Sequence, residues 1–171
     1  LVIVGGVLVG LIESSSLANR TRQSSDILLS PLASKSYIEQ TPAIISLIER
    51  THGVVKYSSR YAEPATITAG YKTKLDPKDT PDYARAIVAG IDPVRENDLT
   101  GIASKVVEGR FLRPNEFGAI VLGSNLLYKY IPIDSPGLQT LDIKGVGEKV
   151  RLTVGGNNKE LTVVGVIKSK V

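Results

Sequence analysis

The chain has 171 residues, of which 42% are hydrophobic and 22% are charged, a composition typical of a folded globular protein. Its 21 Lys and Arg against 17 Asp and Glu leave a net charge of +4, and the scattered cations indicate solvated surface rather than a patch for anionic lipid or nucleic acid. Cysteine is absent, which excludes disulfides, thiol chemistry and thiolate metal sites. Methionine is also absent, even at position 1, so we expect a fragment from which residues are missing.

The N-terminus begins with twelve uncharged, mostly aliphatic residues, LVIVGGVLVGLI, before Glu13. A dinucleotide-binding turn is disfavoured because its glycines do not have the required spacing. A buried strand remains open, but glycines weaken strands and are common in membrane helices. We therefore favour the outer end of a transmembrane helix with a polar stem, over residues 1–22.

Short elements are predicted next, beginning with a strand over 26–32 that ends at Pro31. The stretch TPAIISLIERTHG predicts a helix with Thr41 as N-cap, Pro42 at the first helical position and Gly53 as the stop. Alternating side chains over 54–62 and 65–71 predict a strand and its return strand.

A surface loop is predicted over 72–85, where Asp76, Asp79 and Asp82 lack the residue order of an EF-hand calcium loop. A buried strand follows over 86–92 and ends at Pro93. Near the C-terminus, GEKVRLTVGGNNKELTVVGVIKSK predicts a β-hairpin turning at GGNN, with Gly165 as a bulge or a point of close backbone approach. These elements together predict an α+β domain.

Catalytic residues are sparse. The single histidine, His52, falls at the predicted end of a helix, where capping is its usual role. No serine lies in a G-x-S-x-G motif, and one histidine without cysteine disfavours a zinc site. Glu108 and Glu116 are the carboxylates that a cleft could bring together.

The stretch KVVEGRFLRPNEFGAIVLGSNLLYKY, residues 105–130, is the most distinctive. Gly109 and Gly123 suit tight junctions with positive φ, and Arg110 can grip a carboxylate or a backbone carbonyl. Ser124 or Asn125 is expected to cap a following helix. One face of that helix would carry Leu127, Tyr130 and Ile131. This stretch therefore predicts a structural joint rather than an active site.

Three segments in this order, AIVAGIDP, the 105–130 stretch and the C-terminal hairpin, resemble the extracytoplasmic core domain of MacB-like ABC transporter permeases, the group that includes the FtsX and LolC types. The matching motif residues are Gly90, Glu108, Gly109, Arg110, Phe111, Val121, Leu122, Gly123, Val146, Gly147, Glu148, Lys149, Val150 and 162–166. The chain departs from the family pattern in stopping at Val171 and in a proline-rich link over 131–144.

The resemblance implies a porter-like α+β lobe, over 23–91 and 141–171, with a smaller inserted lobe over 92–140. It also implies which residues form the structural joint of the family motif: Gly109, Arg110, Phe111, Gly123, Gly147 and Gly165.

Function follows from the same resemblance. It implies a non-enzymatic domain outside the cell membrane that couples cytoplasmic ATP hydrolysis to substrate export or partner engagement, without catalytic residue, cofactor or metal of its own. The implied partners are a cytoplasmic ATPase subunit or domain, a second permease in a homodimer or pair, and an extracytoplasmic adaptor or substrate protein. The alternative is a soluble α+β enzyme or ligand-binding domain with a buried N-terminal strand.

Overall fold

The computed structural model describes residues 27–72, 82–131 and 139–168. Contacts divide the chain into two compact units, Leu1–Ser58 with Arg95–Thr100, and Ser59–Val94 with Gly101–Val171. The predicted membrane segment and stem, 1–22, lie outside the described residues. Within the described ranges, no helix is both long and apolar enough to cross a membrane. The lobe boundaries expected at 91/92 and 140/141 stay predictions.

The first unit contains helix α2, Thr41–Arg50, which confirms the predicted helix. Its N-cap is Gln40, at φ 52°, so the cap lies one residue before the predicted Thr41. The Thr41 hydroxyl instead donates to the carbonyl of Ile38 at 2.7 Å, and Pro42 lies at the second helical position rather than the predicted first. The helix ends at Arg50, before the predicted stop at Gly53, and the N–H of its C-cap residue Thr51 donates to the Ile48 carbonyl.

The strand predicted over 26–32 is wrong for the described residues 27–32, which have no regular structure. Ile27 and Leu28 are 77% and 71% exposed, so the aliphatic run covers no core there. Pro31 also lacks the N–H that a strand ladder needs. An apolar run without a partner strand does not form a sheet.

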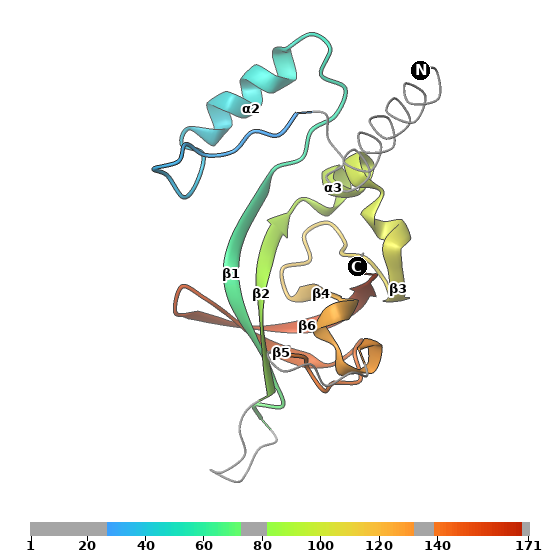
Figure 1. The fold of residues 1–171 in the computed structure, drawn as a ribbon. Coiled ribbons are helices and arrows are strands. Elements are labelled where there is room, and N and C mark those ends of the chain that lie inside the picture. The colour runs from blue at the N-terminus through green and yellow to red at the C-terminus, as the bar shows by residue number, and fades with distance from the viewer. Residues whose placement is uncertain (1–26, 73–81, 132–138, 169–171) are drawn as a thin grey trace, which may run out of the picture. The chain divides into compact units, whose positions relative to one another are not determined.

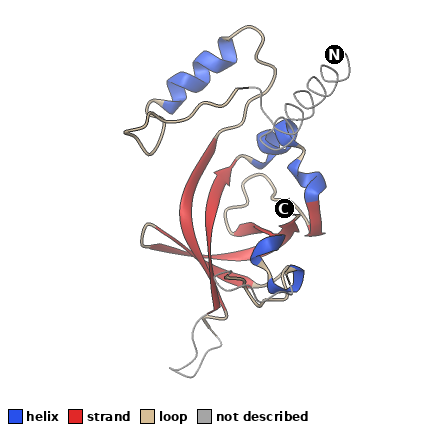
Figure 2. Cartoon of the chain, viewed as in Figure 1, coloured by secondary structure: helices blue, strands red, loops and turns tan. Residues whose placement is uncertain are grey.

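The second unit is a curled six-stranded sheet in the order β2-β1-β5-β6-β3, with β4 paired to β6, so the α+β class is confirmed (Figures 1 and 2). All pairs are antiparallel except β4 with β6. The strands are β1 Arg60–Ala69, β2 Asp82–Ile91, β3 Val106–Gly109, β4 Ala119–Gly123, β5 Lys149–Val154 and β6 Asn157–Ile167.

Strand β1 corrects the predicted hairpin of 54–62 with 65–71, because it runs continuously through Pro64 and pairs along its whole length with β2. Pro64 lies outside the stretch 66–68 where β1 meets β5, so one edge of the strand is open there. Strand β2 also takes in Asp82–Arg85, which were expected to be loop.

The predicted strand over 86–92 is confirmed as part of β2, but its predicted burial is wrong. Because β2 is the edge strand, Ile87 is 75% exposed and only Ala84 is buried along the whole strand. Pro93 ends the strand as expected and begins helix α3, Pro93–Thr100.

The C-terminal hairpin is confirmed as β5 and β6. Gly155 and Gly156 form its two-residue turn with φ of 53° and 85°, the positive values that a tight hairpin requires. Val150 and Leu161 face each other in register and point into the core. The buried hydrophobic core comprises Ala65, Ile67, Ala69, Ala84, Ile120, Leu122, Leu127, Leu141, Val150, Leu161, Val163 and Val166.

The single helix predicted after Gly123 is replaced by two 3-10 turns, Ser124–Leu126 and Tyr128–Tyr130. Leu127 lies between them in extended conformation, is fully buried and forms a β-bridge with Leu141. Tyr130 is 40% exposed, so the expected shared helical face does not form. The tertiary bridge at Leu127 breaks the helical repeat. A further 3-10 turn, Ile102–Lys105, leads into β3.

Candidate functional site

The predicted joint centres on β6. Gly109 at the end of β3 lies opposite Gly165 in register, and the Arg110 N–H donates to the Val164 carbonyl at 2.9 Å. The Gly147 N–H donates to the Val163 carbonyl at 2.8 Å, on the segment that leads into β5. Motif segments far apart in sequence therefore meet on one strand.

Two register shifts mark this joint. The pairing of β4 with β6 passes from Ile120–Val163 to Val121–Gly165, which leaves Val164 as the extra residue. The pairing of β3 with β6 also shifts, between Val106 and Glu108. The predicted bulge or close approach at Gly165 is confirmed.

Glycine is required at two positions of the joint. A Cβ on Gly165 would lie against the carbonyl oxygen of Arg110, and 3.0 Å from its carbonyl carbon. A Cβ on Gly109 would strike Val164 and Val146, and Gly109 has φ 71° as predicted. Gly123 has φ −72°, so the positive φ predicted there is wrong. That glycine follows β4 in ordinary extended backbone.

Arg110 grips both of its predicted kinds of acceptor. Its guanidinium holds the Glu116 carboxylate with two hydrogen bonds of 2.8 and 2.5 Å, and also donates to the Phe111 carbonyl at 3.1 Å. The Arg113 N–H is a further donor to Glu116, at 3.1 Å. The Arg110 hydrogen bonds, then that of Arg113, lower the pKa of Glu116 from 4.5 to about 2. The turn between β3 and β4 is thereby closed by a charged clamp.

Glu108 closes a second clamp. Lys129 and the Tyr130 hydroxyl, the latter at 2.9 Å, donate to its carboxylate, and the Val146 N–H donates at 3.3 Å. Lys129 also donates to the Lys144 carbonyl at 2.6 Å. The hydrogen bond from Lys129 is the main reason why the pKa of Glu108 is lowered. Burial, then Glu108, raises the pKa of Tyr130.

The two carboxylates considered for catalysis are thus each held by a separate cation, and the structure shows no hydrogen bond between them. Both carboxylates are in ion pairs and have a lowered pKa, so both are ionised at neutral pH. A general acid must instead carry a proton at that pH. His52 is exposed in the turn after α2.

Metal-binding candidates gain no support. Asp76 and Asp79 lie outside the described residues, while Asp82 accepts the Asp142 N–H at 2.6 Å. In the part of the chain that the structure describes, no group of three or more His, Cys, Asp or Glu could hold a metal ion.

The sequence patterns did not predict a charged cluster around Glu160, on strands β5 and β6 and the residues that follow β1. Glu160 on β6 accepts hydrogen bonds from Tyr71 at 2.6 Å and Lys149 at 2.9 Å, and pairs with Lys72. The Arg151 guanidinium lies over the Tyr71 ring, 4.2 Å from its centroid. Lys72, followed by Tyr71 and Lys149, lowers the pKa of Glu160 to about 2. The alternation along β5 predicts its polar face, but the cluster depends on the strand register.

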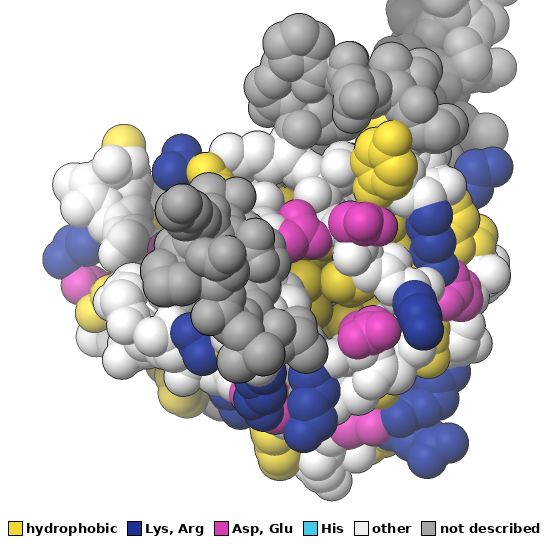
Figure 3. Space-filling model, turned by 90° about the horizontal axis from the view of Figure 1, so that it is seen from below, with side chains coloured by type: hydrophobic (Ala, Val, Ile, Leu, Met, Phe, Trp, Pro, Cys, Tyr) yellow, Lys and Arg dark blue, Asp and Glu magenta, His cyan; other side chains and the backbone are white. Residues whose placement is uncertain are grey.

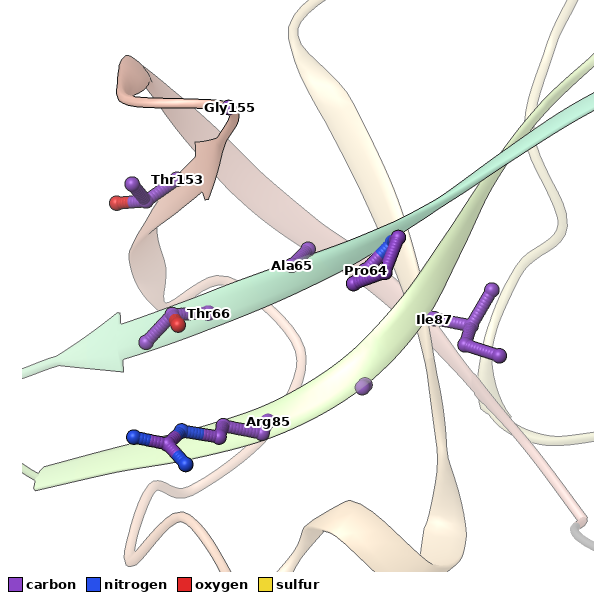
Figure 4. Close-up of a pocket in the computed structure, with 8 residues that line it drawn as sticks. Pro64, Ala65, Thr66, Arg85, Ile87, Thr153 and Gly155 are labelled. Atoms are coloured by element: carbon purple, nitrogen blue, oxygen red, sulfur yellow. The ribbon is translucent and has the colours of Figure 1, made fainter. Parts of the chain in front are cut away.

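A shallow pocket lies on the same unit. Figure 4 shows Thr66 of β1 and Arg85 of β2 on neighbouring strands, with Thr153 of β5 nearby. Its lining residues are Pro64, Ala65, Thr66, Arg85, Ala86, Ile87, Thr153 and Gly155. The Thr66 hydroxyl and the Arg85 guanidinium therefore line an open depression in the sheet, while the Thr153 hydroxyl donates to the Asn158 side-chain oxygen at 2.6 Å.

The Glu116 clamp predicts a pH dependence of stability. Because the pKa of Glu116 is lower in the folded chain than its ordinary 4.5, its contribution is complete above pH 4.5 and is lost as the pH falls toward about 2. In Glu116→Gln, the free energy of unfolding should fall less steeply across this range, as measured by urea titrations at each pH. The control is Glu148→Gln, outside this clamp. Equal slopes in wild type and Glu116→Gln would contradict the assignment.

Comparison with known proteins finds no match among protein-family models, and none among curated protein sequences.

Proposed function

We propose that this chain is the extracytoplasmic domain of an ABC transporter permease, and that it transmits motion rather than catalyses a reaction. The observation that carries the proposal is the convergence of the family-like motif residues on one joint. Gly109, Arg110, Gly147 and Gly165 all contact β6 or its partners through backbone hydrogen bonds or close approach. In the resembled family the same motifs occur in the same order.

The joint has the properties that a coupling element needs. Its strands approach so closely at Gly165 that a single methyl group does not fit. Its two flanking loops are closed by the Arg110–Glu116 and Lys129–Glu108 clamps. Strands tied in this way resist separation, so in the proposal the second unit transmits a displacement as one body.

The energy for this displacement comes, in the proposal, from ATP hydrolysis on a separate cytoplasmic subunit or domain. The permease works as a pair, either with a second copy or with a related permease, and engages an adaptor or a substrate protein outside the membrane. The competing account is a soluble enzyme or ligand-binding domain.

The two accounts differ in whether this domain is attached to the membrane and faces the outside of the cell. The 171 residues contain no cysteine, so one introduced cysteine in them gives a site-specific signal. We would place Val55→Cys in the full-length gene product, freed of any other cysteine, because Val55 is 89% exposed. Labelling by a membrane-impermeant maleimide in intact cells, with the product in the membrane fraction, is the expected result.

Val163→Cys is the matched control, since the same substitution at a fully buried position should be labelled only after denaturation. A Val55→Cys product in the soluble fraction, or one labelled only after the membrane is permeabilised, would remove the permease proposal.

A further inference from the structure

The outward face of the β2-β1-β5 sheet carries two rows of polar side chains. Arg85, Thr66 and Thr153 lie side by side in register, and Tyr83, Thr68 and Arg151 form the next row. Ala65, Ile67 and Ala69 alternate with the threonines of β1 and are buried, so the two rows point away from the core. We call these rows, with Tyr71, Lys72, Lys149 and Glu160, the Thr–Arg face.

The Thr–Arg face is strongly cationic for this chain. It holds four cations, Lys72, Arg85, Lys149 and Arg151, against one carboxylate, Glu160. Its net charge is therefore +3, out of +4 for the whole sequence. Figure 3 shows Lys and Arg side chains gathered along the lower margin of that view, with fewer Asp and Glu between them. Charges scattered along the sequence are thus brought together by strand pairing.

The two guanidinium groups of the Thr–Arg face are placed for an external acceptor, whereas Tyr71, Lys72 and Lys149 already contact Glu160. Among the described residues, Arg85 has no hydrogen bond or ion pair. Arg151 stacks on Tyr71, with its guanidinium carbon 4.2 Å from the ring centroid, and this contact holds it in place. Thr66 adds a hydroxyl group beside Arg85 along the open pocket, whereas the Thr153 hydroxyl donates to the Asn158 side-chain oxygen at 2.6 Å. Guanidinium and hydroxyl donors in this combination recognise phosphate oxygens.

We propose that the Thr–Arg face binds the phosphate headgroups of an anionic lipid surface. The Thr–Arg face spans neighbouring strands, and its depression is open rather than enclosed. This shape suits the surface of a lipid bilayer better than a single small anion. Tyr71 and Tyr83 place amphipathic rings on it, as is common where proteins meet lipid headgroups. The choice of lipid over another phosphate-bearing partner rests on the proposed location beside a membrane.

Sedimentation with vesicles tests this proposal on the full chain. Binding is measured to vesicles with about one third phosphatidylglycerol and to vesicles of phosphatidylcholine alone. The neutral vesicles measure the binding that the apolar N-terminal run contributes without lipid charge. Wild type should prefer the anionic vesicles, and this preference should weaken with salt. The preference is the ratio of binding to anionic vesicles over binding to neutral vesicles. In the double variant Arg85→Gln with Arg151→Gln this ratio should fall about 25-fold, roughly fivefold for each cation removed.

The matched control is Lys105→Gln with Arg113→Gln, which removes the same charge away from the Thr–Arg face and should change the preference by about twofold or less. Circular dichroism verifies that both double variants are folded. An equal loss in the two variants, or equal binding of wild type to both vesicles, would overturn the proposal. So would release by inorganic phosphate but not by chloride of equal ionic strength, since the ligand would then be free phosphate.

Failure here is distinguishable from failure of the permease proposal. If Val55→Cys is labelled from outside while wild type shows no preference for anionic vesicles, only the Thr–Arg face assignment is lost.

Discussion

Gly165→Ala should destabilise the second unit by about 3 kcal/mol, because the added methyl group has no room beside the backbone of Arg110. The new Cβ would meet the backbone of Arg110, which is itself held by its hydrogen bond to Val164. Neither backbone can move without breaking the pairing of β6 with β3 and β4. Chemical denaturation gives the loss directly, and the thermal midpoint should fall by about 12 °C, at about 4 °C for each kcal/mol in a unit of this size.

Gly118→Ala is the matched control for this prediction. A Cβ at Gly118 has no heavy atom within 4 Å, and its φ is not in the left-handed region. The free energy of unfolding should therefore change by about 0.5 kcal/mol or less. Similar losses for the two alanine variants would mean that the close approach at Gly165 has no special role.

Leu127→Ala should cost about 3 kcal/mol, because Leu127 is completely buried and its bridge to Leu141 ties two loops to the core. The substitution leaves a cavity between the two 3-10 turns that their backbone hydrogen bonds prevent from closing. Equilibrium unfolding in urea measures this loss.

Leu47→Ala makes the same chemical change at a position that is 66% exposed on α2. We expect a change of about 0.5 kcal/mol or less for this control. If Leu127→Ala were equally mild, residues 124–131 would not pack as described.

Local sequence patterns predicted the elements that depend on neighbouring residues. The helix at α2 was located by Pro42 and its apolar spacing, and the hairpin of β5 and β6 by alternation around Gly155 and Gly156. The class α+β follows from these elements. Gly165 was singled out because a glycine within a strand pattern indicates a bulge or close approach, which the register shift confirms.

Predictions that depended on distant partners were less successful. Pro64 was interpreted as a break between two strands, yet β1 continues through it because β2 pairs along its whole length. Leu127 has helical spacing to Tyr130, but its bridge to Leu141 decides the local conformation. Tertiary pairing overrode local preference in both cases.

In the candidate site too, contacts between residues close in sequence were predicted and contacts between distant segments were not. Arg110 was expected to grip a carboxylate or a carbonyl, and the nearby Glu116 and Phe111 fulfil both roles. The pairing of Glu108 with Lys129 and the rows of the Thr–Arg face join segments whose contact only strand register could reveal. No spacing rule in the sequence reports that register.

The most direct measurement of the central claim is the labelling of Val55→Cys by an impermeant maleimide in intact cells. Our account predicts labelling before lysis of a membrane-retained product, with Val163→Cys unreactive until denatured. A Val55→Cys product that fractionates as soluble, or that reacts only once the membrane is opened, would contradict an extracytoplasmic permease domain.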